Sequence, residues 1–212
     1  DHELFTEGLR AVLERSWEGC RVHCATEVGT ALAILERDAE WDLLLADMNM
    51  PGMDGRAFLR SLAERQSLVP VVMMSAEEDP FLIRDAMQLG ALGFVPKQFS
   101  TDAIVDALNE FLEQGMYLPQ DLAQQLQALP ASRPATDRDS LLARFKITER
   151  QLQVLELMQE GYANREIAQV LHVSENTVKT HVKVLFQAIG VGSRLECVRE
   201  AQRVGLLASG IH

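Results

Sequence analysis

Three polar residues with complementary chemistry each stand at the end of a short apolar run. Asp47 directly follows residues 43–46, and Ser75 directly follows residues 71–74. Lys97 comes shortly after a third run of this kind. A carboxylate can attack a phosphoryl group, while an ammonium and a hydroxyl can contact the phosphoryl oxygens. These residue types predict a phosphoryl-transfer site, provided that the fold brings the three runs side by side.

The apolar runs alternate with segments of helical periodicity throughout the first half of the chain. We expect strands at residues 20–25, 42–46, 70–74 and 92–95, and helices at residues 3–15, 30–36, 54–64, 81–89 and 101–113. Apolar strands separated by helices are typical of a parallel sheet covered on both faces. The predicted fold of this half is therefore a doubly wound α/β domain, in which polar chemistry gathers at the carboxyl ends of the strands.

This half of the chain resembles the receiver domain of two-component response regulators. The first matching segment is Asp1-His-Glu-Leu-Phe, which resembles the family's acidic pair leading into its first helix. Asp47 stands at the phospho-acceptor position, in Asp-Met-Asn-Met-Pro-Gly-Met-Asp-Gly. Ser75, Phe94 and Lys97 occupy the positions of the family's hydroxyl residue, switch aromatic residue and lysine.

The resemblance implies a role for each of these positions. Asp47 would accept the phosphoryl group from a phosphohistidine on a sensor histidine kinase. Mg²⁺ would be held by the carboxylates of Asp1 and Asp47 and by the main-chain carbonyl of Asn49. Ser75 and Phe94 would move together when the site is filled.

The family has a five-stranded, flavodoxin-like sheet with strand order 2-1-3-4-5. Its first strand and a second acidic residue precede the position of Asp1, so both are absent from this chain. We therefore expect the strands at residues 20–25 and 42–46 to lack their shared neighbour, and we interpret residue 1 as a truncation.

Cysteine content and hydropathy indicate a cytoplasmic protein. Three cysteines give no disulfide framework, and no apolar run reaches the ~20 residues that span a bilayer. Cys20 and Cys24 would share one face of the strand expected at residues 20–25, which favours buried thiols over a metal-binding pair. No membrane contact is expected.

The acidic residues are concentrated in the first half. Residues 1–113 contain 9 Lys and Arg against 21 Asp and Glu, whereas residues 148–212 contain 7 of each. A neutral domain can still bind a polyanion if its bases share one face, because charges are screened over ~8 Å at physiological salt.

The last part of the chain is predicted to be helical. A helix capped by Thr148 runs to residue 160, a short helix covers residues 164–171, and Ser174 caps the next helix, which extends to residue 189. The last of these has an apolar face and an opposite polar face. The apolar face holds Val178, Val182, Leu185 and Ile189, and the polar face holds Asn176, Lys179, Thr180, Lys183 and Gln187.

Two short helices joined by a tight turn, the second with amide, hydroxyl and lysine side chains, are typical of a helix-turn-helix with its recognition helix. Asn176, Lys179, Thr180 and Lys183 are the expected contacts to bases. Arg165 and Arg194 lie elsewhere and are expected to contact phosphates.

Residues 147–208 also resemble the LuxR-type helix-turn-helix of NarL/FixJ regulators. The matching segments are Ile147-Thr-Glu-Arg-Gln-Leu-Gln-Val-Leu155, Asn164-Arg-Glu-Ile-Ala168, Val173-Ser-Glu-Asn-Thr-Val-Lys-Thr-His181 and Gly205-Leu-Leu207. The resemblance implies that Lys179, Thr180 and Lys183 face the DNA groove. Gln151 stands where an acid is usual in the family, and Gln187-Ala188 where a base is common. We therefore expect fewer phosphate contacts and a shallower salt dependence of DNA binding than for a more basic relative.

The sequence therefore predicts a receiver domain at residues 1–113, a linker with a short helix at residues 114–146, and an all-α helix-turn-helix domain at residues 147–212. The expected function is that of a transcriptional response regulator, not an enzyme, switched by phosphorylation of Asp47. Mg²⁺ is the expected cofactor. The expected partners are promoter DNA, a sensor histidine kinase and a second copy of the chain, with RNA polymerase as a further candidate.

Two alternatives remain open. An aspartyl-phosphate phosphatase would also place a carboxylate after an apolar strand, but it requires a second acid two residues later, where this chain has Asn49. A constitutive DNA-binding protein would use the first domain only for dimerisation, and the presence of Asp47, Ser75 and Lys97 argues against it.

Overall fold

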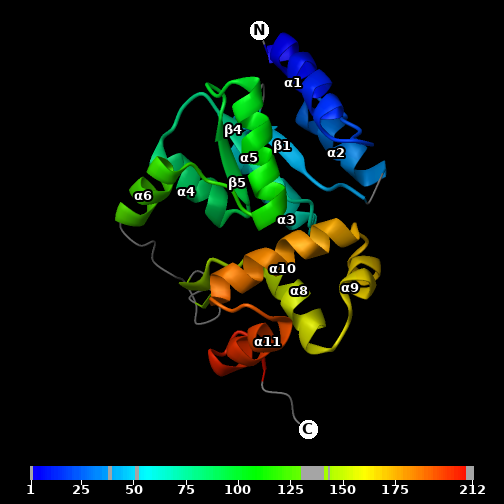
Figure 1. Cartoon of the computed structure of the whole chain (residues 1–212), viewed down its shortest axis with the longest axis vertical. Coiled ribbons are helices and arrows are strands. Elements are labelled where there is room, and N and C mark those ends of the chain that lie inside the picture. Colours follow the sequence, from blue (N-terminus) through cyan, green and yellow to red (C-terminus); the bar gives the residue numbers. More distant parts are fainter. Residues whose placement is uncertain (1, 38–39, 51–52, 130–140, 143, 209–212) are drawn as a thin grey trace.

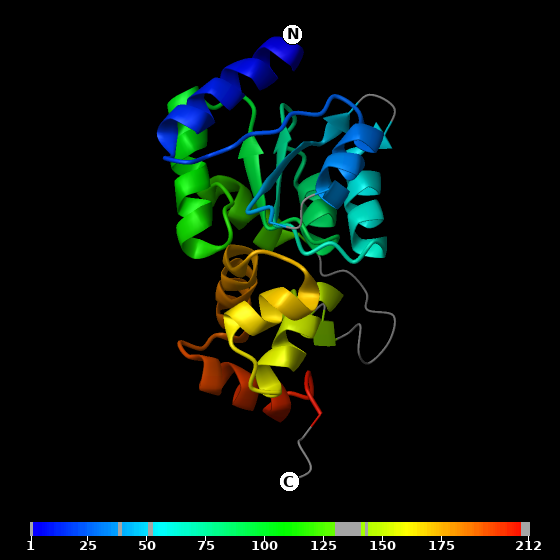
Figure 2. The same ribbon diagram turned by 90° about the vertical axis from the view of Figure 1, so that its right-hand side faces the viewer.

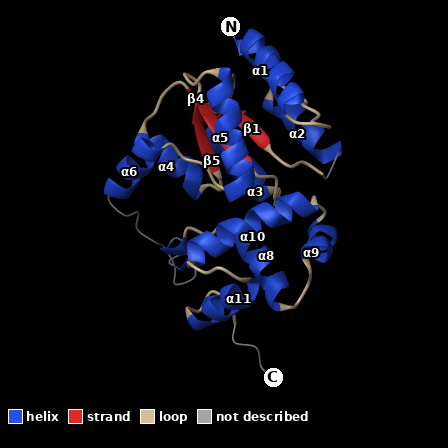
Figure 3. Cartoon of the chain, viewed as in Figure 1, coloured by secondary structure: helices blue, strands red, loops and turns tan. Residues whose placement is uncertain are grey.

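The computed structural model describes residues 2–37, 40–50, 53–129, 141–142 and 144–208, which form an α/β unit followed by a helical unit (Figure 1). The α/β unit contains α1 (His2–Ser16), α2 (Val28–Arg37), β1 (Leu44–Asp47), β2 (Asn49–Met50), β3 (Met53–Asp54), α3 (Gly55–Glu64), β4 (Val71–Ser75), α4 (Pro80–Gln88), β5 (Gly93–Pro96) and α5 (Thr101–Gln114). Then come α6 (Gln120–Ala128), α8 (Glu149–Gln159), α9 (Asn164–Leu171), α10 (Glu175–Ile189) and α11 (Arg194–Arg203). The helices α1 to α5 and α8 to α10 begin and end within two residues of the limits predicted for them. The strands drawn in red in Figure 3 lie in the first unit.

The sheet of the first unit is parallel, with strand order β1-β4-β5. Its register pairs Asp47 with Met74 and Ser75 with Pro96, so the carboxyl ends of the three strands lie level with one another. A separate antiparallel pair, β2 and β3, forms the turn that follows β1. The parallel α/β prediction is confirmed.

Helices cover both faces of this sheet. Residues of α2, α3, α4 and α6 pack in one apolar cluster with Met73 and Phe94, whereas residues of α1 and α5 pack in another with Val72 and Val95. Neighbouring residues of a strand point to opposite faces, and all four of these side chains are almost fully buried. The α/β unit therefore has the doubly wound architecture expected from its apolar strands.

The strand expected at residues 20–25 is not present; this segment lies outside the strands and helices. A β-strand is stabilised by its ladder of hydrogen bonds, and no described strand lies beside this segment. Among the described residues, β1 likewise pairs with β4 alone. A cleft of about 740 Å³, lined by residues 20–25, β1 and parts of α1 and α10, separates the two segments. This arrangement agrees with the expectation that both segments lack their shared neighbour.

Because residues 20–25 form no strand, the environment of two cysteines differs from the prediction. Cys20 is half-buried and Cys24 is exposed, so the predicted burial of both thiols is wrong for Cys24. Cys197, in α11, is fully buried, and burial raises its pKa to about 11. The thiolate is the reactive form of cysteine, so Cys197 should be inert near neutral pH.

We expect iodoacetamide at pH 8 to modify Cys24 in the folded chain and to leave Cys197 unmodified. With a pKa near 11, only about one Cys197 thiol in a thousand is ionised at that pH. Peptide mass spectrometry after brief alkylation measures both sites. Urea-unfolded chain is the control, in which both cysteines should react at similar rates.

The helical unit has its own core. The residues buried there include Leu155, Ile167, Val178, Leu185 and Cys197, contributed by α8, α9, α10 and α11. The apolar face predicted for residues 174–189 is confirmed, because Val178, Val182, Leu185 and Ile189 all belong to this core. No helix in the described ranges is both long enough and apolar enough to cross a membrane.

Replacing Leu185 with alanine should destabilise the helical unit by about 2–5 kcal/mol, because it removes a fully buried side chain and leaves a cavity. Leu195→Ala is the matched control, since 60% of the surface of Leu195 is exposed, and it should change stability by about 0.5 kcal/mol or less. Urea unfolding followed by circular dichroism measures both variants. Equal losses would contradict the packing described here.

Candidate functional site

Asp47, Ser75 and Lys97 meet at the carboxyl edge of the sheet, as predicted. The Lys97 ammonium forms an ion pair with Oδ2 of Asp47, and both side chains are largely buried. The main chain connects the same strands, since the Lys97 N–H donates to the Ser75 carbonyl at 2.8 Å. A nucleophilic carboxylate, a cation and a hydroxyl therefore share one edge of the sheet.

The turn after β1 orients the Asp47 carboxylate. Its Oδ1 accepts the main-chain N–H of Asn49 at 3.0 Å, and the Met48 N–H donates to the Met74 carbonyl at 2.7 Å. Gly55 begins α3 where the chain passes close behind Asp47. A Cβ atom at Gly55 would lie 2.9 Å from the Asp47 carbonyl, closer than such atoms approach, so this position requires glycine. Oδ2 and Oδ1 of Asp47 thus face different partners.

Ser75 is 2% exposed, and its Oγ accepts the Glu77 N–H at 3.0 Å. This bond fixes the hydroxyl oxygen at the start of the loop between β4 and α4. Phe94 is also buried, in the apolar cluster that contains α4 and α6. The roles predicted for these two residues in switching remain predictions.

Two further residues belong to the site and were not identified from the sequence. The ring of Phe5, in α1, lies 6.0 Å from Nζ of Lys97, within the range of a cation–π contact. Gln98 donates from Nε2 to the Ala76 carbonyl and so links the loops after β4 and β5. Neither residue type signals phosphoryl chemistry. The position of Gln98 next to Lys97 is the one signal that the sequence offered.

The donors available for a metal ion are oxygen atoms of the β1 end and the turn after it. Asp47 contributes a carboxylate and Asn49, in β2, a main-chain carbonyl, and such hard oxygen ligands suit Mg²⁺. Asp1, the other predicted ligand, lies outside the described residues.

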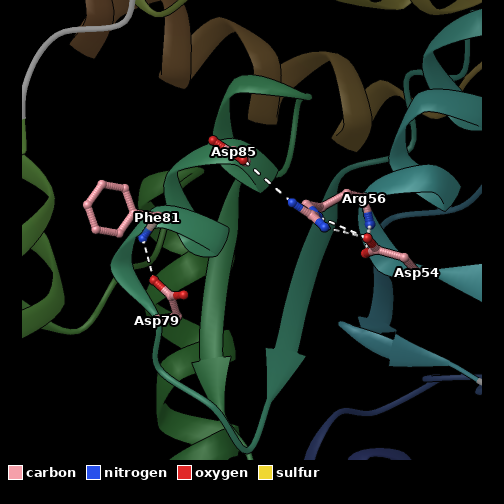
Figure 4. Close-up of polar contacts among 5 residues, drawn as sticks. All are labelled: Asp54, Arg56, Asp79, Phe81 and Asp85. Atoms are coloured by element: carbon pink, nitrogen blue, oxygen red, sulfur yellow. Dashed lines mark hydrogen bonds and ion pairs between the residues drawn. The ribbon is translucent and has the colours of Figure 1, made fainter.

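Charged side chains connect Asp54 of β3 and Arg56 of α3 with α4, as Figure 4 shows. Arg56 bonds to Oδ2 of Asp54 at 2.7 Å, and its other terminal nitrogen lies 3.6 Å from Asp85 of α4. The hydrogen bond from Arg56 lowers the pKa of Asp54, which also caps the first turn of α3. Asp79 caps α4 in the same way by accepting the N–H of Phe81 at 2.8 Å. One arginine thus joins the start of α3 to α4.

In the helical unit, α9 and α10 form the predicted helix-turn-helix. His172 ends α9 in the left-handed conformation, and Ser174 caps α10 by accepting the Thr177 N–H at 2.9 Å. Thr148 and Gln151 form a capping box at the start of α8. These local features follow directly from the residue types at the helix ends.

The polar face of α10 is turned toward the α/β unit rather than toward solvent. Figures 1 and 2 show α10 lying against the α/β unit in both views. Lys183 donates to the Leu112 carbonyl at 2.9 Å and Gln187 to the Gln114 carbonyl at 3.1 Å, both in the last turn of α5. Thr180 is only 6% exposed. The expectation that this face is exposed is wrong for Thr180 and Lys183, because a second domain covers it.

The start of α10 is held by another part of the α/β unit. Ser174 donates to Oδ1 of Asp42 at 3.2 Å, and the Thr177 hydroxyl donates to the Trp41 carbonyl at 2.8 Å. Asn176 and Lys179 are exposed but line the cleft shared with the α/β unit, and Lys179 pairs with Glu175 at 2.9 Å.

Each unit also contributes one apolar residue to a core of the other unit. Leu68, from the loop before β4, is buried in the core of the helical unit, while Val184 of α10 is buried with α1 and α5. Separating the units would expose both of these apolar side chains to water, which costs free energy. The contact is therefore a packed interface and not a chance approach of two surfaces.

The two predicted phosphate contacts differ in their surroundings. Arg165, at the start of α9, is exposed. Arg194 is half-buried and donates to Asn164 at 3.2 Å and to the carbonyls of Tyr162 and Met158. Arg194 therefore joins α11 to the turn between α8 and α9, and any contact with phosphate remains a prediction.

Family models match both halves of the chain. Residues 1–109 match the response regulator receiver domain, and residues 146–201 match the bacterial regulatory proteins of the luxR family. The glycerol metabolism activator of Pseudomonas putida is 31% identical over 210 residues, which cover 98% of this chain and 95% of the relative. The transcriptional regulatory protein DegU of Brevibacillus brevis is 29% identical and covers 97% and 91% of the two chains.

Solved structures show the same fold. The response regulator RcsB of Salmonella typhimurium has a TM-score of 0.54 at 21% identity, covering 94% of each chain. A LuxR-family two-component response regulator from Aurantimonas has a TM-score of 0.53 at 23% identity, over 60% of this chain and 90% of that one. At these identities the likeness concerns the fold alone.

An alanine at Gly115 should wedge the two units apart. Gly115 ends α5 with φ 83°, and a Cβ there would lie 3.0 Å from the Thr180 carbonyl and 3.2 Å from Cβ of Lys183. Gly190→Ala is the matched control, since Gly190 ends α10 with φ 78° and has no atom within 4 Å of such a Cβ. Both variants should lose about 1 kcal/mol through backbone strain.

Only Gly115→Ala should increase the radius of gyration measured by small-angle X-ray scattering, because only this variant pushes α10 away from α5. A radius of gyration that rises equally in both variants, or in neither, would contradict the packing of α10 on Gly115.

Proposed function

The chain belongs to the response regulators that join a receiver domain to a LuxR-type helix-turn-helix, and we propose that phosphorylation of Asp47 releases its recognition helix α10 from the receiver. The observation that carries this proposal is that side chains of α10 are hydrogen-bonded to the receiver. Lys183 and Gln187 donate to carbonyls of α5, so they are not available to DNA in this arrangement. A signal that separates the domains would make them available.

The chemical step is transfer of a phosphoryl group from a phosphohistidine of a sensor kinase to Asp47. A carboxylate oxygen attacks phosphorus, the phosphorus–nitrogen bond breaks, and the histidine leaves with its electron pair and takes up a proton. Receiver domains generally bind Mg²⁺. For this chain we propose Asp47, the Asn49 carbonyl and Asp1 as its ligands; the ion would offset charge on the phosphoryl oxygens.

The residues around Asp47 would respond to the new group. Lys97 now balances the Asp47 carboxylate, and after transfer its ammonium would instead face a phosphoryl oxygen. The Ser75 hydroxyl proton would turn toward another of these oxygens, with the buried Phe94 moving in concert. Lys97 lies just before α5, the helix whose last turn holds α10, so a shift at one end of α5 would reach the interface at the other.

Released α10 would dock in the major groove. Asn176, Lys179, Thr180 and Lys183 would face base edges, since amide, hydroxyl and amine groups match their hydrogen-bonding pattern. Arg165 and, once freed from its present bonds, Arg194 would contact phosphates. A homodimer would place two such helices on two half-sites, as helix-turn-helix proteins do. RNA polymerase remains a candidate partner.

We assign the receiver to residues 1–113, a linker with the short helix α6 to residues 114–146, and the DNA-binding domain to residues 147–212. A regulator that binds DNA constitutively is the rival function. The buried α10 interface favours the switch, because a permanently active protein would gain nothing from covering its recognition helix.

The test combines intact mass with DNA binding. Incubation with Mg²⁺ and acetyl phosphate should add one phosphoryl group to the wild-type chain and none to Asp47→Ala. Asp106→Ala is the control, because it removes an exposed acid of α5 away from the site and should still be modified.

Fluorescence anisotropy with duplex DNA at fixed salt should show binding about 5–150-fold tighter for the phosphorylated chain, the usual range of coupling between two sites. Equal affinity of the modified chain, the unmodified chain and Asp47→Ala would instead support constitutive binding. Failure to gain mass would refute the role of Asp47.

A further inference from the structure

One buried histidine lies at the contact between the domains. His181, in α10, is 5% exposed, and its Nε2 lies 2.7 Å from the main-chain carbonyl of Leu68 in the receiver. A carbonyl can only accept a hydrogen bond, so Nε2 carries the proton and donates. This places the neutral ring in the tautomer that leaves Nδ1 unprotonated.

The second nitrogen of the ring has no matching partner. Nδ1 of His181 is buried and makes no hydrogen bond within the described part of the chain. Adding a proton there would create a buried N–H without an acceptor, together with a full positive charge, and both are costly away from water. The closed arrangement therefore tolerates the neutral ring and rejects the charged one.

The neighbouring charges do not relieve this cost. The charged group of α8 that acts on His181 is the Arg150 guanidinium, which repels a second positive charge. α10 itself carries Lys179 and Lys183 on adjacent turns. The receiver contributes the uncharged Leu68 carbonyl.

We propose that protonation of His181 opens the contact between the receiver and α10, so that the closed arrangement responds to pH as well as to phosphorylation. This inference rests on the closed and open arrangements of the proposed function. It requires neither the phosphoryl transfer nor DNA. The phosphorylation signal and the pH signal would act on the same interface from different residues.

The direction of the effect follows from linkage. Burial lowers the pKa of His181 in the closed chain, against a smaller opposing effect of the bond to Leu68, and Arg150 lowers it further. In the open chain the ring would be solvated, with a pKa of about 6.5. Because the open form binds the proton more tightly, lowering the pH favours the open form. The closed form is therefore fully favoured only above the pKa of the open form, and it becomes less favoured as the pH falls below that value. Between pH 7.5 and 5.5 the closed-to-open ratio should therefore fall, by at most about tenfold, the limit set by a ring that is protonated only in the open form.

Small-angle X-ray scattering on the unphosphorylated full chain, coupled to size-exclusion chromatography, measures this opening. The radius of gyration of the wild type should rise between pH 7.5 and 5.5 while its circular dichroism stays constant. His181→Gln keeps an amide donor for the Leu68 carbonyl but cannot be protonated, so its radius should stay low at both pH values.

Two histidine controls separate this effect from other titrations. His172→Asn changes an exposed histidine in the left-handed conformation, which asparagine also adopts, and it should open like the wild type. His23→Gln changes the ring that packs edge-on against Trp41 at 5.2 Å, near the start of α10, and it should also open. Loss of opening in His23→Gln with retention in His181→Gln would overturn the proposal.

Further measurements are needed if the closed form is so stable that the radius of gyration does not change, or if a variant disturbs folding. Lys183→Ala removes one bond to α5 and should bring the opening of the otherwise native chain into range. NMR titration of the wild-type His181 ring should show protonation only together with opening. A ring that protonates near pH 6.5 while the chain stays compact would refute the inference. So would a radius that is constant in both the wild type and Lys183→Ala.

Because this test contains no phosphodonor and no DNA, its result is independent of the test of the proposed function. A chain that opens with acid but gains no phosphoryl group would retain the inference and lose the role of Asp47. A chain that is phosphorylated and binds DNA but ignores pH would retain the proposed function and lose the role of His181.

Discussion

The carbonyl groups in the last turn of a helix have no donor within that helix, and in α5 two of these carbonyls accept hydrogen bonds from the recognition helix. Lys183 and Gln187 of α10 satisfy the carbonyls of Leu112 and Gln114. The same Lys183 amine would serve for a hydrogen bond to a base edge in DNA. The two uses exclude each other, so under the proposed function the arrangement of the domains would depend on which acceptor α10 bonds.

The interface is built for separation as well as for contact. Its polar part consists mainly of bonds to main-chain carbonyls and to one carboxylate, Asp42, which lies at the N-terminus of α10. An acidic group is favourable at a helix N-terminus, and a DNA phosphate would be favourable at the same end. Leu68 and Val184 add apolar burial, which is non-directional and does not favour one set of hydrogen-bond partners over another.

Rigid elements connect the carboxyl edge of the sheet, where Asp47, Ser75 and Lys97 lie, with the interface between the receiver and α10. Asp47 and Ser75 stand at the ends of neighbouring strands, and Lys97 leads through a short turn into α5. Arg56 joins the start of α3 to α4 beside the same edge. A helix moves as one body because its hydrogen bonds are internal, so in the proposed switch a displacement near Lys97 would be transmitted to the carbonyls that hold α10.

The sequence by itself determined the parallel α/β order, the helix limits, and the meeting of Asp47, Ser75 and Lys97, because these depend on local periodicity and on the common edge of parallel strands. Local pattern could not decide what needs a distant partner. Residues 20–25 have a strand composition, but no described strand pairs with them. The periodicity of one helix places Thr180 on a polar face, whereas contact with the receiver buries both Thr180 and His181. Phe5 contacts Lys97, and Leu68 contacts His181, although each pair is far apart in the sequence. Only the tertiary structure decided these contacts.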